Sequence, residues 1–250
     1  MASATLPAGL LDALRQAGRV VFLTGSGVSA ESGVPTFRDA LTGLWSRFRP
    51  EELATPEAFR RDPQLVWDWY RERRRQVAAV MPNPAHHAIA ALQAWLPETL
   101  LVTQNVDGLH QRAGSADTVE FHGNLFSNRC RACGHEAPQL DPEIAAPPPC
   151  PDCGELMGPG VVWFGEAIPG EALQRAWRGA AEADVLLAVG TSGLVTPAAA
   201  LPEVARQAGA RVAEINLHPT PLSAQADFVV TGPAALSLPA MVAALIKKSP

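Results

Sequence analysis

The sequence predicts an α/β fold with a doubly wound parallel sheet and a small zinc-binding module. Short apolar runs typical of buried strands alternate with amphipathic helical segments along the chain. Small and polar residues cluster where several of these runs end, and all four cysteines fall into two C-x-x-C pairs. Alternating strands and helices are typical of parallel sheets, and paired cysteines are typical of metal sites.

Composition and charge limit what the protein can be. The chain has 250 residues, of which 47% are hydrophobic and 18% are charged, which suits one sizeable α/β core and a small appended module. Its formal net charge of −5 argues against a nucleic-acid binder and against a membrane-surface protein. No apolar run approaches the roughly 20 residues that span a bilayer, and no secretion signal opens the chain. We therefore expect a cytoplasmic protein, and we expect it to be a monomer.

The first elements lead into a glycine-rich turn. Residues 8–18 are expected to form an amphipathic helix, and residues 20–23 a buried strand. In the motif Gly25-x-Gly27-x-x-Ala30 that follows, missing Cβ atoms would let backbone N–H groups approach a phosphate. The spacing is that of a dinucleotide-binding turn, although a tight turn without a ligand is an equal alternative on this signal alone. A proline soon after the motif predicts a loop there.

The next helix carries two polar side chains on one face. Residues 62–80 combine an Asp-Pro start with an apolar stripe of helical spacing, which predicts a capped helix. Tyr70 and Arg73 stand three residues apart, so a phenol and a guanidinium can converge on one small acid group. Because three further arginines stand beside them, a solvated arginine-rich face is the alternative interpretation.

Two further strand ends carry candidate site residues. A helix over 84–95 and a strand over 99–103 precede the segment Gln104-Asn105-Val106-Asp107, whose amide and carboxylate could recognise a carboxamide such as that of nicotinamide. An ordinary Asn/Asp turn is the alternative.

His122 lies at the other strand end, over residues 120–124, and its neutral imidazole would suit a general base. A lone histidine is nonetheless often an ordinary polar residue, so this alternative stays open.

The cysteine pairs give the strongest single signal. Each C-x-x-C bends so that two thiolates reach one ion, and 16 residues separate the pairs Cys130/Cys133 and Cys150/Cys153. Two disulfides are the alternative, which the missing secretion signal disfavours. Four thiolates leave no open coordination position. We therefore predict one structural Zn²⁺ ion for each chain.

Residues 161–166, V-V-W-F-G-E, are expected to form a strand. Its edge could pair with an extended substrate peptide, or the strand could be purely structural.

The last third returns to alternating elements. Strands are expected over 183–189, 210–216 and 227–230, with helices over 197–208 and 233–247. Gly190, Thr191 and Ser192 follow the first of these strands, and Asn216 ends the second. Hydroxyl and amide groups at such strand ends can bind ribose and phosphate oxygens. These elements complete the doubly wound topology.

Six motifs in one order resemble the sirtuins, the NAD-consuming protein lysine deacylases. Residues 24–38 are similar to the signature G-A-G-x-S-x-E-S-G-I-P-x-F-R, and Q-N-V-D, H-G, the cysteine pairs, G-T-S and I-N follow in sirtuin order over residues 20–234. Tyr-x-x-Arg and W-F-G-E resemble the class III members, in which Tyr-x-x-Arg receives the carboxylate of succinyl-, malonyl- or glutaryl-lysine.

The resemblance implies a function and a set of site residues. The expected reaction is NAD-dependent removal of these acyl groups, and of acetyl, from protein lysines bound in extended form, which yields nicotinamide and O-acyl-ADP-ribose. His122 would be the general base, and Tyr70, Arg73, Val162, Trp163, Phe164 and Gly165 would bind substrate. The implied NAD contacts are Gly25, Ser26, Gly27, Ala30, Glu31, Phe37, Arg38, Trp45, Gln104, Asn105, Val106, Asp107, Gly190, Thr191, Ser192, Asn216, Leu217, His218 and Ala234.

The expected division of the chain follows these motifs. Residues 1–40, 82–123 and 160–250 would form the Rossmann-like NAD-binding domain, 41–81 the helical part of a small domain with the acyl pocket, and 124–159 the zinc module. The alternative from another class is a sensor of NAD or ADP-ribose that has lost turnover. A zinc-ribbon nucleic-acid protein is poorly supported, because the residues around the cysteines are not strongly basic.

Overall fold

The computed structural model describes residues 6–34, 49–138, 141 and 143–246, and it contains two sheets. The larger sheet has six strands that pair in parallel, in the order β3-β2-β1-β7-β8-β9. This is the 3-2-1-4-5-6 order of a doubly wound fold, whose direction of winding reverses between β1 and β7. The predicted fold class is therefore confirmed. The strands are β1 (Arg19–Thr24), β2 (Glu98–Thr103), β3 (Thr118–Glu120), β7 (Val185–Val189), β8 (Arg211–Asn216) and β9 (Phe228–Thr231).

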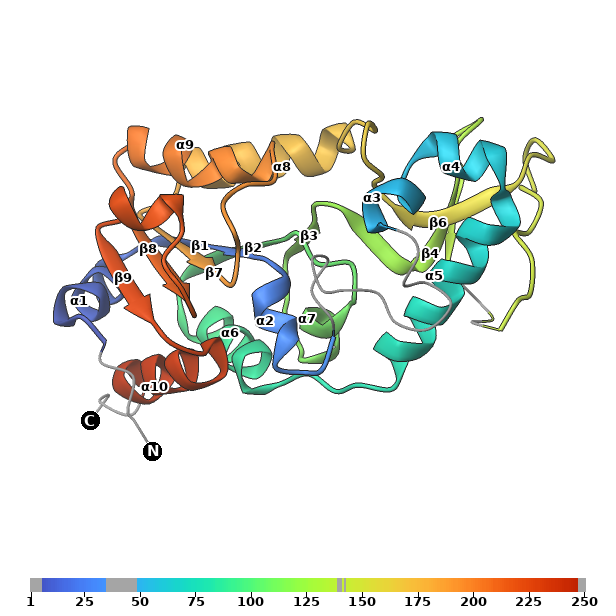
Figure 1. Ribbon diagram of the computed structural model, residues 1–250. Coiled ribbons are helices and arrows are strands. Elements are labelled where there is room, and N and C mark those ends of the chain that lie inside the picture. The colour runs from blue at the N-terminus through green and yellow to red at the C-terminus, as the bar shows by residue number, and fades with distance from the viewer. Residues whose placement is uncertain (1–5, 35–48, 139–140, 142, 247–250) are drawn as a thin grey trace.

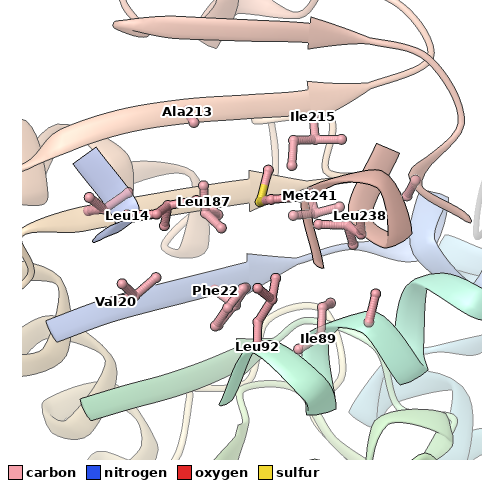
Figure 2. Packing of buried hydrophobic residues seen from close by; sticks show 14 of the residues in the cluster. Leu14, Val20, Phe22, Ile89, Leu92, Leu187, Ala213, Ile215, Leu238 and Met241 are labelled. Carbon is pink, nitrogen blue, oxygen red and sulfur yellow. The ribbon is translucent and has the colours of Figure 1, made fainter. Parts of the chain in front are cut away.

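Helices cover both faces of this sheet (Figure 1). Alternate side chains of β1 enter two different cores: Val20 and Phe22 pack with α1, α6 and α10, whereas Val21 and Leu23 pack with α8 and α9. Figure 2 shows the first of these cores from close by, with side chains from the strands and from three helices around Phe22. The covering helices are α1 (Ala8–Gln16), α6 (Pro84–Trp95), α8 (Gly170–Ala181), α9 (Leu201–Gln207) and α10 (Ala234–Ile246).

The smaller sheet is antiparallel, in the order β5-β4-β6, and three helices pack beside it (Figure 1). A separate hydrophobic cluster joins these helices to β4 and β6. The predicted division of the chain into domains is compatible with this arrangement and stays a prediction. The elements are α3 (Pro50–Leu53), α4 (Pro56–Arg61), α5 (Pro63–Ala78), β4 (Gly123–Cys130), β5 (Glu136–Pro138) and β6 (Met157–Val161).

Local sequence explains where the main helices start. The side chain of Asp62 accepts the backbone N–H of Leu65 and so caps α5, and Asn83 caps α6 by accepting from Ala85. In both cases a proline follows the cap, at a position whose N–H has no helical partner. Within the described ranges, the remaining short elements are α2 (Ser26–Ala30), α7 (Leu109–Arg112) and the 3₁₀ helices η2 (Ala198–Ala200) and η3 (Pro221–Ala224).

Two expectations need correction. The helix expected over 197–208 is split, because η2 precedes α9. The strand expected over 161–166 is wrong, because β6 ends at Val161 and a turn follows. The carboxylate of Glu166 accepts the N–H of Trp163, and Gly165 has φ +83°, so this segment folds back on itself. None of the helices within the described ranges is long and apolar enough to cross a membrane.

Candidate active site

The site lies at the carboxyl ends of the parallel strands, where the loops after β1, β2, β3, β7 and β8 meet. At the point where the winding reverses, the loops after β1 and β7 touch backbone to backbone. The N–H of Gly25 donates to Val189 O at 3.0 Å, and the N–H of Gly27 donates to Gly190 O at 2.9 Å. A Cβ atom added to Gly25 or Gly27 would lie 2.8 Å from Gly190 O. The glycines therefore make room for the neighbouring loop. Their backbone N–H groups, which the sequence predicts to face a phosphate, instead donate to carbonyl oxygens of that loop.

Amide side chains tie three of these loops together. Gln104 Nε2 donates to the hydroxyl of Thr191 at 3.0 Å, and Asn216 Nδ2 donates to the carbonyl oxygen of Thr191 at 2.8 Å. The hydroxyl of Ser192 accepts the backbone N–H of Leu194 at 3.4 Å. Hydrogen bonds thus connect the predicted site residues at the ends of β2, β7 and β8 along one edge of the sheet.

Asn105 and Asp107 meet at a serine that sequence reasoning did not single out. Ser29, buried in α2, donates to Asp107 Oδ2 at 2.7 Å and accepts from Asn105 Nδ2 at 3.1 Å. Asp107 Oδ1 accepts the N–H of Leu109 at 2.9 Å. Burial raises the pKa of Asp107, and these two hydrogen bonds oppose the rise. The carboxylate keeps further lone pairs, so it can accept an N–H from a carboxamide.

Two buried histidines lie beneath this group. The His86 and His110 rings are 4.8 Å apart, edge to face. His86 Nδ1 accepts the N–H of Asn83 at 3.2 Å, so its Nε2 carries the proton and faces the Ser29 hydroxyl at 3.3 Å. Burial lowers the pKa of His86 to about 4, and burial together with the neighbouring His86 lowers the pKa of His110 to about 3. Both rings are therefore neutral at pH 7.

These histidines make stability depend on pH. An unfolded histidine has a pKa of 6.5, so below that pH the unfolded chain binds more protons than the folded one. The histidines therefore lower the free energy of unfolding little above pH 6.5, and they lower it progressively as the pH falls toward 4. Between about pH 6.5 and 5 we expect the free energy of unfolding to fall by about 1 kcal/mol per pH unit for each histidine, because the unfolded ring is only half protonated at pH 6.5. Denaturant unfolding of His86→Asn should show a slope smaller by that amount. His87→Asn, on the exposed side of the same helix, should keep the full slope, and an unchanged slope in His86→Asn would contradict this.

His122 follows β3 and is half-buried beside Phe121. Its Nδ1 lies 3.1 Å from the carbonyl oxygen of Gln104. A carbonyl can only accept, so Nδ1 carries the proton and Nε2 keeps a free lone pair. Burial lowers the pKa of His122, and the bond to Gln104 partly offsets this. The ring is thus held neutral and in the tautomer that a general base at Nε2 requires.

The other predicted cofactor residues are placed less centrally. Glu31 Oε1 accepts the N–H of Ala235 at 3.0 Å and so joins the end of α2 to the start of α10, beside Ala234. Val106 packs against the hydrophobic cluster that joins α3, α4 and α5 to β4 and β6. Leu217 and His218 are exposed after β8. Three further predicted cofactor residues, Phe37, Arg38 and Trp45, lie outside the described residues.

Tyr70 and Arg73 lie side by side among aromatic rings. The hydroxyl of Tyr70 accepts from Trp163 Nε1 at 3.0 Å, and burial raises the pKa of Tyr70 to about 12. The guanidinium of Arg73 lies over the Trp69 ring, with Cζ 5.2 Å from the ring centroid. Burial lowers the pKa of Arg73, and the charge of Asp107 acts in the opposite direction. Arg73 therefore lies close enough to Asp107 for the two charges to interact.

The arginine-rich face of α5 is not a uniform solvated surface. Arg74 is fully buried, and it donates to Leu125 O at 2.6 Å and to Asn128 Oδ1 at 3.1 Å. Arg75 pairs with Glu143 at the surface. Within the described ranges no carboxylate lies within ion-pair distance of Arg73 and no hydrogen bond reaches its guanidinium. Each arginine thus has a different environment.

The segment after β6 lies between His122 and the end of α3. The N–H of Val162 donates to His122 O at 2.8 Å, and that of Phe164 donates to Ala54 O at 2.9 Å. The Trp163 side chain is only 2% exposed, whereas that of Phe164 is 46% exposed. Trp163 is therefore buried in the cluster with α3, α4 and α5, while Phe164 and Gly165 lie at the surface of the segment.

The four cysteines converge on one point. Cys130 Sγ lies 3.5 Å from Cys153 Sγ, Cys133 Sγ lies 3.6 Å from Cys150 Sγ, and all four sulfur atoms lie within 4.8 Å of one another. None of the four forms a disulfide. Zn–S bonds of about 2.3 Å in a tetrahedron place sulfur atoms about 3.8 Å apart, so this arrangement fits Zn²⁺ with four thiolate ligands. The prediction of a structural zinc site, not two disulfides, is confirmed.

Comparisons with known proteins agree with this geometry. The model of the Sir2 family matches residues 25–197. An NAD-dependent protein deacylase of Ralstonia nicotianae is 55% identical over 244 residues, which cover 97% of this chain and 98% of the relative.

Solved structures are also similar over nearly the whole chain. A Sir2 homologue crystallised as its NAD complex has a TM-score of 0.92 and 44% identity, over 99% of this chain and 96% of that chain. Sir2 bound to an acetylated peptide has a TM-score of 0.82 and 29% identity, over 92% and 94%. The predicted enzyme class is that of the matched deacylase, and the predicted NAD dependence agrees with both findings. The chain therefore belongs to the Sir2 family, as its motifs predict.

Proposed function

We propose that this NAD-dependent protein deacylase prefers lysines that carry acidic acyl groups, namely succinyl, malonyl and glutaryl, and that it also accepts acetyl-lysine. One observation carries the proposal. The guanidinium of Arg73 is half-buried beside Tyr70, and no described carboxylate neutralises it by direct contact. A half-buried cation without an anion is costly, and a ligand carboxylate would remove that cost.

Tyr70 adds a second group suited to an acyl carboxylate. Its oxygen already accepts from Trp163 Nε1, so the hydroxyl proton remains available for donation to a ligand. A pKa of about 12 keeps that proton on the phenol at neutral pH. A phenol and a guanidinium on one helix face can therefore bind the same carboxylate, and the arginine can do so through two parallel N–H groups.

The catalytic step follows from the His122 tautomer. During the family reaction the acyl oxygen attacks the ribose C1′ of NAD as nicotinamide leaves. Nε2 of His122, with its free lone pair, would then accept the proton of a ribose hydroxyl, and Gln104 O would hold the ring through Nδ1. Asn105 and Asp107 would bind the carboxamide of nicotinamide, with Ser29 orienting both. Attack of that ribose oxygen on the acyl carbon, with addition of water and departure of the lysine amine, would give lysine, nicotinamide and O-acyl-ADP-ribose.

The substrate is expected to be an acylated protein segment in extended form. Support comes from a similar solved protein that binds an acetylated peptide. The peptide would lie against the segment Val162–Gly165, whose backbone already joins His122 to Ala54. Backbone pairing tolerates many sequences, so we expect acyl recognition to be sharper than sequence recognition. A cytoplasmic location, a monomeric state and the lack of a nucleic-acid partner stay predictions.

Replacing Arg73 with methionine tests this proposal, because methionine keeps an unbranched apolar stem but removes the charge. We expect kcat/KM for a succinyl-lysine peptide to fall about 10- to 100-fold, the loss of a hydrogen bond to a charged group. The value for the same peptide with acetyl-lysine should change less than about threefold, because acetyl carries no charge to pair.

A matched control is available on the same helix. Arg75→Met removes an arginine that pairs with Glu143 at the surface, so both activities should stay near those of the wild type. Equal losses on both peptides in Arg73→Met would contradict the role of Arg73 in reading the carboxylate.

A further inference from the structure

Arg131 stands in the first cysteine knuckle and reaches out of it to the wall of the acyl pocket. The residue follows Cys130 directly, and its guanidinium carbon lies 3.7 Å from the centroid of the Trp163 ring. The Arg131 side chain is 18% exposed and that of Trp163 is buried. A guanidinium stacked this closely on an indole forms a cation–π contact.

Hydrogen bonds fix Arg131 in this position. Its Nη1 donates to Arg129 O at 3.1 Å and to Pro159 O at 2.7 Å, and its Nη2 donates to Val161 O at 2.8 Å. Its Nε lies 3.2 Å from Glu166 Oε1. The planar guanidinium of Arg131 therefore binds β6, the end of β4 and the turn after β6 at the same time. The single ammonium group of a lysine could not reach all of these partners.

Strand β6 carries a glycine where this stack crosses it. A Cβ atom added to Gly158 would lie 2.9 Å from Arg131 Nη1 and 3.1 Å from the Trp163 ring. The small residue thus leaves space for the guanidinium and the indole together.

Trp163 links Arg131 to Tyr70, because its ring contacts both residues. Glu166 accepts the N–H of Trp163 through Oε2 at 2.9 Å while it also faces Arg131, so both the backbone and the ring of Trp163 are held. The indole Nε1 donates to Tyr70 OH at 3.0 Å. Because this bond occupies an acceptor site of the phenol, it determines the direction in which the phenol proton can point.

We infer that Arg131 is a positioning residue for acyl selectivity: through Trp163 it orients the Tyr70 hydroxyl toward the carboxylate of an acidic acyl group. The zinc module then has a second role, because it holds the residue that shapes the acyl pocket. This inference rests on the proposed function for its effect on selectivity. The link from Arg131 to Tyr70 can be measured without any substrate.

Tyr70 is the only tyrosine of the chain, which makes a direct readout possible. Protein labelled with ¹³C at tyrosine Cζ gives one resonance, and its chemical shift reports the hydrogen bonds of the phenol oxygen. We expect Arg131→Gln to shift this resonance while the zinc content stays at one ion per chain. The matched control is Arg129→Gln, which removes a side chain that faces Glu136 on the neighbouring strand β5 and should leave the resonance unmoved.

Kinetics test the effect on selectivity. In Arg131→Gln we expect KM for the succinyl-lysine peptide to rise about tenfold with kcat little changed, because the acyl carboxylate is remote from the reacting carbon. KM for the acetyl-lysine peptide should change less than about twofold. In a protein that already carries Tyr70→Phe, Arg131→Gln should raise KM for the succinyl-lysine peptide little further. Both substitutions act through the same hydrogen bond between Trp163 and Tyr70.

The outcomes separate this inference from the proposed function. An unmoved Cζ resonance in Arg131→Gln, or losses that add fully to those of Tyr70→Phe, would overturn the role of Arg131 whatever the acyl preference. A wild-type enzyme without succinyl preference would instead contradict the proposed function. If Arg131→Gln does not fold, Arg131→Lys keeps the charge but not the fork, and it should show the same resonance shift and the same rise in KM.

Discussion

Replacing His122 with alanine is expected to lower kcat/KM for deacylation about 10²- to 10⁴-fold, the usual contribution of a general base. The half-buried ring has one N–H directed at Gln104 O, so the lone pair on Nε2 is the group that the substitution removes. The fold should survive, because the backbone carbonyl of residue 122 still accepts from Val162. Deacylation and nicotinamide release should be measured together with thermal unfolding and zinc content.

The pH dependence gives an independent check on His122. The base must be neutral, and burial lowers its pKa, so kcat/KM should hold to a pH below the ordinary range of histidine and then fall as the ring becomes protonated. His87→Ala, which removes an exposed histidine, should keep both the rate and this profile. Full turnover in His122→Ala would show that another group is the base.

Replacing a buried cysteine of the zinc site is expected to have the largest effect on stability. Cys150→Ser removes one of four thiolate ligands, and the binding energy of such structural zinc sites is on the order of 10 kcal/mol. Apolar packing adds little to the module, since its described hydrophobic cluster contains only Cys130, Cys150 and Met157, with Ala137 packed beside them. We expect zinc to be lost, the module to unfold and activity to disappear.

The two cores of the large sheet do not include the cysteines, so much of the α/β fold should persist in Cys150→Ser. Metal analysis, far-ultraviolet circular dichroism and thermal unfolding will show whether it does. Ala132→Ser, at an exposed position inside the first knuckle, should leave all three unchanged. A Cys150→Ser protein with full zinc content and native melting would contradict the assignment of the ligands.

Local chemistry made most of the fold predictable. Strand β1 is a run of β-branched and apolar residues that is buried on both faces, and the helices α5 and α6 begin with a capping side chain followed by proline. The turn at Val162–Glu166 escaped prediction because its apolar composition resembles a strand. In the turn the Trp163 N–H donates to the carboxylate of Glu166, a contact that composition does not reveal.

The site was predictable where a motif combines unusual residues at fixed spacing, as in the cysteine pairs. Ser29, His86 and His110 were missed because their roles depend on contacts between segments that are distant in sequence. His86 and Ser29 stand 57 residues apart, yet their side chains face each other in the interior. Glu31 similarly binds the backbone of a residue 204 positions away. Nothing in the local sequence of these residues signals such partners.

One measurement on the wild-type protein tests most directly whether acidic acyl removal is coupled to NAD consumption. The wild-type protein should be given NAD and a single peptide that carries either succinyl-lysine or acetyl-lysine, with deacylated peptide and nicotinamide followed together. We expect one nicotinamide per lysine released and a kcat/KM for succinyl at least about tenfold above that for acetyl. An acetyl preference, or nicotinamide release without lysine release, would contradict the account.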